Sequence, residues 1–283
     1  MPDTGIGPAD LVIARATPAE WATVKEWAAA EGWNPGERDA GAFFAQDPEG
    51  FFLGYVDGAP VSAISVVNYG SDYAFLGFYL VRPDLRGLGL GMVTWQAGLE
   101  HAGHRVVGLD GVPDQQDNYR RSGFELAYHS ARFVGIPDLP PPDSTVRALE
   151  PGDIPALHRY DSACLPADRP EFLSAWLAES GHRTVVRIVD GTLTGFATSR
   201  PARDEVRVGP LFADSDTDAR QLLSALAGGV TLAVDVPLSN DRAVWLMREA
   251  GLTPSFETAR MYTGPTRTHC TEKVFGVTTL ELG

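Results

Sequence analysis

The chain repeats itself at a nearly constant interval, and this repeat limits its possible folds more than any other feature. Asp57-Gly58 and Asp190-Gly191 stand 133 positions apart, each between two apolar runs. Asp-Gly in that setting is a strong signal for a β-hairpin. Arg15 and Arg147, each in a short strand-like run before a proline turn, stand 132 positions apart. We therefore predict two copies of one fold within the 283 residues.

Both copies are predicted to have the same order of elements: strand, helix, hairpin, strand, helix, strand, helix, strand. The boundary between them is indicated by the run IPDLPPPDST, whose four prolines remove backbone donors that a helix or central strand needs. We predict a domain over residues 1–136, a proline-rich linker over 137–143 and a second domain over 144–283. The fold class of each is mixed α/β.

Composition excludes several classes of protein. The net charge of −14 disfavours nucleic-acid binding, which depends on clustered Lys and Arg. No window reaches the length of a membrane span, and the first residues lack a basic, apolar leader, so we expect a cytoplasmic protein with no membrane contact. Cys164 and Cys270 form no metal-binding pair, and no metal is expected. The oligomeric state, monomer or homodimer, stays open.

The most informative segment covers residues 72–103. An apolar strand-like run is followed by Arg82-Pro83, then by glycines at positions 87, 89 and 91, and then by a helical pattern. Glycines let backbone amides turn toward one point, and the following helix directs its positive dipole end there. Such a loop can hold a pyrophosphate. A mononucleotide site is disfavoured because the Gly-Lys-Ser/Thr it needs is missing.

The strand, the sequence V-R-P-x-x-R-G-x-G-x-G and the helix resemble the acetyl-coenzyme A (acetyl-CoA) signature of the GNAT superfamily of N-acetyltransferases. A second GNAT signature, Tyr-x-x-x-Gly-Phe, corresponds to residues 119–124. The resemblance covers residues 11–135 and, with the repeat, implies a tandem GNAT arrangement. It also implies that each domain has a mixed, mostly antiparallel central sheet flanked by helices.

The resemblance further implies where acetyl-CoA binds. Pantetheine is expected to pair with backbone near Leu80 and Val81, where two strands splay, and the pyrophosphate to meet the amides of the loop. The expected loop residues are Arg86, Gly87, Leu88, Gly89, Leu90, Gly91 and Met92. Tyr119 is expected to contact the cofactor and return a proton to the departing thiolate. Trp33 and Phe78 are expected to line the pocket of the amine acceptor, a small molecule or a peptide.

The catalytic base is harder to assign. Many GNAT relatives carry a glutamate on the strand before the Arg-Pro step, but the run AFLGFYLV at 74–81 contains no acid. Asp72 at the start of this strand and Asp110 at the end of the next remain as candidates. Asp110 could instead cap the short helix after Pro113, and a water relay without an essential base is also open.

The second copy departs from the cofactor signature. It has no R-x-x-G-x-G, and Asp214, Asp216 and Asp218 stand where phosphates would bind. Met247 stands where the signature tyrosine would be. We therefore expect a GNAT-like domain without a cofactor. The predicted function is acetyl-CoA-dependent N-acetyl transfer to a primary amine in the first domain, and the alternative is an acyl-CoA-binding sensor or assembly domain without turnover.

Overall fold

Both predicted hairpins are present at the Asp-Gly dipeptides. The computed structural model describes residues 5–283. Asp57 and Gly58 have φ of 50° and 76°, and Asp190 and Gly191 have φ of 50° and 75°. Positive φ at both central residues is what a tight type I′ hairpin turn requires. The repeat predicted from the sequence is therefore confirmed at its two most specific positions.

The elements follow one another in the same order in the two halves. The first half contains β1 (Val12–Arg15), α1 (Pro18–Ala30), α2 (Ala40–Gln46), β2 (Phe51–Val56), β3 (Ala59–Tyr69), β4 (Tyr73–Val81), α3 (Leu90–Ala102), β5 (Val106–Gly111), α4 (Gln116–Arg121) and β6 (Glu125–Gly135). The second contains β7 (Val146–Ala148), α5 (Ile154–Cys164), α6 (Pro170–Ala178), β8 (Arg183–Val189), β9 (Thr192–Pro201), β10 (Val206–Ala213), α7 (Asp216–Ala227), β11 (Leu232–Pro237), α8 (Asp241–Glu249), β12 (Thr253–Tyr262) and β13 (Val274–Gly276).

The predicted element order is wrong in one respect. Each half has two helices, not one, between its first strand and its hairpin: α1 and α2, then α5 and α6. The overlooked helix α2 is only seven residues long. A helix this short is marginal by itself and depends on tertiary packing. Here α2 and α6 pack against each other across the middle of the molecule.

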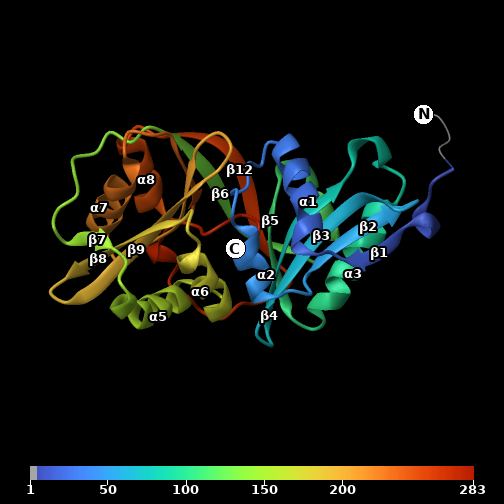
Figure 1. Cartoon of the computed structure of the whole chain (residues 1–283), viewed down its shortest axis with the longest axis horizontal. Coiled ribbons are helices and arrows are strands. Elements are labelled where there is room, and N and C mark those ends of the chain that lie inside the picture. Colours follow the sequence, from blue (N-terminus) through green and yellow to red (C-terminus); the bar gives the residue numbers. More distant parts are fainter. Residues whose placement is uncertain (1–4) are drawn as a thin grey trace.

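The strands of the described chain join in one continuous sheet, because the two halves exchange their last strands (Figure 1). The strand order is β1-β2-β3-β4-β5-β12-β6-β11-β10-β9-β8-β7. Thus β12 of the second half pairs with β5 of the first, and β6 of the first pairs with β11 of the second. Most pairs are antiparallel, as predicted, and β4–β5 and β10–β11 are parallel. The predicted boundary lies between β6 and β7, but it does not divide the sheet.

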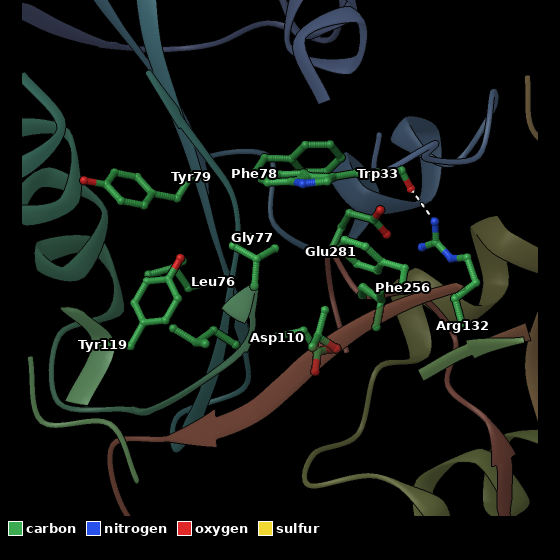
Figure 2. A pocket seen from close by; sticks show the side chains of 14 residues that line it. Trp33, Leu76, Gly77, Phe78, Tyr79, Asp110, Tyr119, Arg132, Phe256 and Glu281 are labelled. Atoms are coloured by element: carbon green, nitrogen blue, oxygen red, sulfur yellow. Dashed lines mark hydrogen bonds between the residues drawn. The ribbon is translucent and has the colours of Figure 1, made fainter. Parts of the chain in front are cut away.

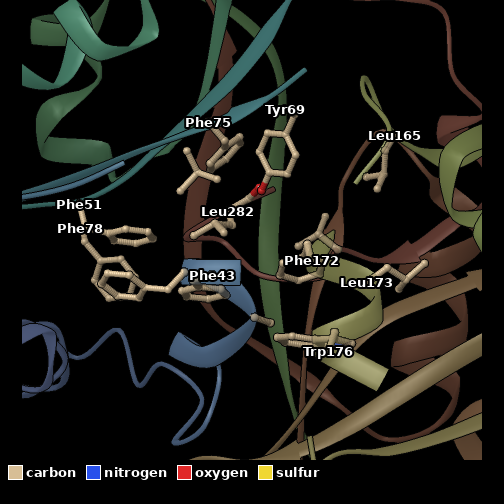
Figure 3. Packing of buried hydrophobic residues seen from close by; sticks show 14 of the residues in the cluster. Phe43, Phe51, Tyr69, Phe75, Phe78, Leu165, Phe172, Leu173, Trp176 and Leu282 are labelled. Carbon is tan, nitrogen blue, oxygen red and sulfur yellow. The ribbon is translucent and has the colours of Figure 1, made fainter. Parts of the chain in front are cut away.

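One hydrophobic core extends through both halves (Figure 3). Phe43 of α2 stacks on Phe172 of α6, with ring centroids 6.3 Å apart. Tyr69 of β3 donates a hydrogen bond from its hydroxyl to the carbonyl of Leu282, at 2.9 Å. Burying aromatic and aliphatic side chains from both halves in one cluster contributes to stability only when the halves stay together.

Residues 274–283, which we call the C-terminal segment, begin with β13 and run between the halves. In the second half, β10 and β11 pair only over Val206–Val208 and Leu232–Val234, and they diverge beyond this point. There β13 pairs with β10, and the Val277 amide donates to the Asp235 carbonyl of β11 at 2.8 Å. The C-terminal segment therefore fills the gap between the diverging strands of the second half.

Candidate active site

The site is built where two parallel strands of the first half diverge. β4 and β5 pair from Tyr73/Val106 to Leu76/Leu109 and no further. Beyond Leu76, the edge of β4 that faces β5 has no ladder partner among residues 5–283. A pocket opens in this gap, with walls from β4, β5, α4, β6, β12 and the C-terminal segment (Figure 2). The expected splay of the two strands is present.

A β-bulge reshapes β4 at the pocket. Phe78 and Tyr79 together stand opposite a single residue of β3, Ile64. Phe78 adopts a φ of 46°, which is an unfavourable conformation for a bulky side chain. Bulges are common beside active sites, because they redirect side chains and interrupt strand pairing.

The glycine loop connects β4 to α3. Gly87 and Gly89 have φ of 83° and 82°, the left-handed region that favours glycine. Arg86 shapes the loop, since its Nε donates to the Val81 carbonyl at 3.0 Å and its guanidinium pairs with Glu31. At the start of the 13-residue helix α3, the Met92 amide donates to the Gly89 carbonyl at 3.2 Å, and the amides of Leu90 and Gly91 precede the hydrogen-bonded ladder of the helix. The loop therefore presents backbone donors and a positive helix end, as an anion site needs.

Tyr119 enters the pocket from α4 and is almost fully buried. Its ring stacks on Trp95 of α3, with centroids 5.6 Å apart. Burial raises the pKa of Tyr119 well above its usual value. A phenol is protonated at neutral pH even at its usual pKa, so Tyr119 has a proton to donate.

Asp110 lines the same pocket, but both of its oxygens are occupied. Arg260 of β12 donates from Nε at 3.0 Å and from Nη2 at 2.7 Å. The alternative that Asp110 caps the helix after Pro113 is wrong, because Val112 occupies that N-cap position and no side chain caps it. Burial raises the pKa of Asp110, while Arg260 acts in the opposite direction. Asp110 is nevertheless poorly placed to take a proton from a substrate, because Arg260 engages both of its oxygens.

Asp72 lies apart from this pocket. It is exposed at the turn before β4 and lines a different surface hollow, with Asp168 and Arg267. Gly77 lies five positions after Asp72, or about 16 Å along the strand at 3.3 Å per residue. The structure therefore does not bring Asp72 together with Tyr119.

Trp33 and Phe78 both line the pocket, so the structure brings these two expected acceptor residues together (Figure 2). Trp33 lies in the loop after α1, and its backbone carbonyl accepts a hydrogen bond from Arg132 at 2.8 Å. Phe256 of β12 adds another aromatic wall, and it comes from the second half.

Sequence reasoning missed one acidic residue of the pocket, Glu281. It belongs to the C-terminal segment and is only 5% exposed. Within residues 5–283, its Oε2 is enclosed and has no hydrogen-bond partner. No signal could have identified it, because this segment has no counterpart in the repeat of the first half.

The comparisons with known proteins agree with this geometry. Two family models match: the acetyltransferase (GNAT) family over residues 18–124 and an acetyltransferase (GNAT) domain over residues 157–276. The chain is 35% identical over 271 residues to the holothin acyltransferase of Pseudoalteromonas sp. (strain SANK 73390), covering 93% of this chain and 92% of that protein. The chain belongs to the GNAT acyltransferase family.

Solved structures share the GNAT fold over nearly the whole chain. A protein of Pyrococcus horikoshii, provisionally described as an acetyltransferase, superimposes with a TM-score of 0.81 at 21% identity, covering 97% of this chain and 96% of that one. A tandem GNAT protein from the clavulanic acid biosynthesis pathway gives a TM-score of 0.63 at 15% identity, covering 90% and 99% of the two chains. The predicted tandem GNAT arrangement is therefore confirmed.

GNAT enzymes use acyl-CoA, and the residues of the first half fit such a molecule. The unpaired edge of β4 can pair with an amide-containing chain, and the glycine loop can accept its phosphates. Asp84, the acid inside the loop, is already paired with Arg82 at 2.6 Å. In the part of the chain that the structure describes, no helix is long and apolar enough to cross a membrane, and no group of three or more His, Cys, Asp or Glu could hold a metal.

The corresponding GNAT elements of the second half are arranged differently. Each of the three acids at the start of α7 is paired: Asp214 with Lys273 at 2.8 Å, Asp216 with Arg242 and Asp218 with Arg187. Met247, at the position of the signature tyrosine, is buried in the core of that half. β13 and the residues after it thus fill the gap between β10 and β11, and acidic side chains stand where the first half has its glycine loop.

Proposed function

We propose that the first half transfers an acetyl group from acetyl-CoA to a primary amine. The observation that carries the proposal is the asymmetry of the two halves. In the first half, Tyr119 lines the pocket between the diverging strands. The glycine loop lies beside this pocket, since a Cβ on Gly91 would lie 2.6 Å from the hydroxyl of the pocket residue Tyr79. In the second half, the corresponding gap is filled by β13 and the corresponding loop is acidic.

The domain division and the residue roles belong to the same proposal. Pantetheine lies along Leu80 and Val81, the phosphates meet the loop, and the acceptor lies between Trp33 and Phe78. The phosphate-binding residues are Arg86, Gly87, Leu88, Gly89, Leu90, Gly91 and Met92. The thioester supplies an activated acyl carbon, and the chain positions the amine and exchanges the protons. Tyr119 donates the proton that the departing sulfur takes up.

The residues that line the pocket indicate which amine acceptors to test. Aromatic walls from Trp33 and Phe256 suit a planar or cationic amine. The relative named holothin acyltransferase makes holothin one acceptor to include in an assay. Polyamines, amino acids, aminoglycosides and lysine peptides complete the set, with thiol release as the measurement.

Calorimetric titration with acetyl-CoA tests where the cofactor binds. We expect a single site per chain, lost in Gly89→Glu, because Gly89 has a φ of 82° and a carboxylate there repels phosphate. Asp216→Asn in the second half is the matched control and should bind as the parent chain does. Circular dichroism checks that both variants are folded. Two equal sites, or none, would contradict the proposal, and tight binding without thiol release from any acceptor would favour a sensor.

A further inference from the structure

Glu281 has no assigned role, yet it lies in the pocket where the proposed reaction takes place. The reaction needs a group that removes a proton from the incoming amine, which is an ammonium ion at neutral pH. β4 supplies no acid between Tyr73 and Val81. Asp110 is held by Arg260, and Asp72 lies elsewhere. Within the pocket, Glu281 is the remaining carboxyl group of the described chain.

The C-terminal segment passes close to β4, and this places the Glu281 carboxyl group in the pocket. Gly77 of β4 has its backbone so close to the Glu281 carbonyl that a Cβ at position 77 would lie 2.1 Å from that oxygen. Glycine at this position therefore gives the segment room to approach β4. In Figure 2, Glu281 lies between Gly77, Trp33 and Phe256, at the point where β4 and β5 diverge.

The segment is held firmly on both sides of Glu281. The Arg169 guanidinium donates to Thr278 Oγ1 at 2.7 Å and to the Gly283 carbonyl at 3.3 Å. Leu282 is buried in the shared core, and its carbonyl accepts the hydrogen bond from Tyr69. A carboxyl group placed on such a fixed backbone loses little entropy when it receives a proton.

Each of the three arginines around Glu281 pairs with another carboxylate, and two of them share one. Arg200 pairs with Asp39 at 2.9 Å, Arg132 with Asp235 at 2.9 Å, and Arg207 also with Asp235. No ion pair within 4.0 Å joins any of the three arginines to Glu281 in the described residues. Burial raises the pKa of Glu281, whereas Arg207, Arg200 and Arg132 act in the opposite direction and Asp39 acts with burial. A carboxylate of raised pKa is a stronger base at neutral pH than an ordinary one.

We propose that Glu281, delivered from the second half into the pocket of the first, is the proton acceptor for the amine. This inference rests on the proposed function of the first half. Glu281 takes one proton from the ammonium group, and the free amine then forms the bond to the acyl carbon. The bond from that carbon to sulfur breaks, the sulfur leaves with the electron pair, and Tyr119 supplies its proton. The second proton of the attacking nitrogen and the proton held by Glu281 then leave to solvent, from which Tyr119 is reprotonated.

The test compares Glu281→Gln with Glu272→Gln, an exposed glutamate just before the same segment. For the parent enzyme we expect kcat/KM to rise with pH through the raised pKa of Glu281, because only the carboxylate accepts a proton. Glu281→Gln should lose about 100-fold or more in kcat and lose this acidic limb. Its affinity for acetyl-CoA should stay within about twofold. Glu272→Gln should match the parent enzyme throughout.

Melting temperature separates catalysis from a purely structural role. If Glu281 only balanced the buried arginines, Glu281→Gln would lower the melting temperature and leave the pH profile unchanged, and that result would overturn the proposal. Equal activity in Glu281→Gln would overturn it as well. Should Glu281→Gln fail to fold, Glu281→Asp is the test, because it keeps a carboxylate that is set back by one methylene. We expect a lower kcat in this variant with the acidic limb of the pH profile retained. A kcat equal to that of the parent enzyme would contradict the role. Absence of acetyl transfer in the parent enzyme with every acceptor would count against the proposed function itself.

Discussion

At the residue scale, Tyr119 and Asp110 differ in how far away in the sequence their partners lie. Tyr119 sits on a helix of six residues, and its position is set by stacking on Trp95 and by an edge contact with Phe124, 6.3 Å between centroids. Its motif is local, so the sequence predicted it. Asp110 was harder, because its partner Arg260 lies 150 positions away. No local pattern can show that a distant arginine occupies both oxygens of a carboxylate.

Replacing Tyr119 by Phe removes the hydroxyl and keeps the ring contacts. We expect kcat to fall by about 100-fold or more, because general acid catalysis contributes roughly that much. Affinity for acetyl-CoA should change by less than about threefold. Steady-state kinetics and calorimetry measure the two quantities. Tyr55→Phe, at a partly exposed hydroxyl that donates to Glu20, is the control. An unchanged kcat in Tyr119→Phe would remove the phenol from the mechanism.

At the scale of elements, β4 determines the site. Its apolar run predicts a strand, and the Arg-Pro step and glycine loop predict where it ends. The bulge at Phe78 and the approach of the C-terminal segment at Gly77 could not be predicted. Both depend on neighbours far away in the sequence, and a glycine in a strand indicates a close backbone approach without saying which segment approaches. The missing strand glutamate was visible in the sequence, but the residue that we propose in its place was not.

Gly77→Ala tests the contact between β4 and the C-terminal segment. The added methyl group would meet backbone rather than a flexible side chain, so the segment has to move. We expect a loss of about 1–3 kcal/mol in the free energy of unfolding, typical of overpacking. Acetyl transfer should fall in parallel, because Glu281 moves with the segment. Chemical denaturation and steady-state assays measure these effects.

The control for this variant is Gly41→Ala on α2. An added Cβ at position 41 meets nothing within 4 Å, and Gly41 does not have a positive φ. Its stability should stay the same or rise by up to about 1 kcal/mol, because alanine is the better helix former. Equal stability of Gly77→Ala and the parent chain would show that the segment can yield at this contact.

At the scale of the whole molecule, the exchanged strands join the halves. The repeat indicated two copies, and nothing in it indicated that β12 would pair with β5 rather than remain in its own half. Related strands have similar patterns of apolar residues and similar ladder donors and acceptors, so local sequence does not distinguish the two pairings. What favours the exchange is long-range: the shared core around Phe43 and Phe172, and the buried pairing of Asp39 with Arg200.

Separating the halves should therefore disrupt both. Residues 1–136 alone lose β12, the C-terminal segment and one side of the shared core, and residues 144–283 alone lose β6. We expect neither fragment to unfold cooperatively or to bind acetyl-CoA, whereas the full chain should unfold in a single calorimetric transition. Co-expression of the two fragments should restore binding. Cooperative melting and acetyl-CoA binding by fragment 1–136 alone would contradict this expectation.

Strand exchange between two copies of a fold is also how many symmetric dimers are built, but there symmetry gives both active sites the same residues. Joining the copies in one chain removes that restriction. One copy can keep the glycine loop and an open gap between its strands, while the other fills its own gap and sends residues 274–283 toward its neighbour. The molecule thus resembles a heterodimer of one subunit with an open pocket and one subunit that supplies part of its wall, whose ratio is fixed at one to one by a peptide linkage.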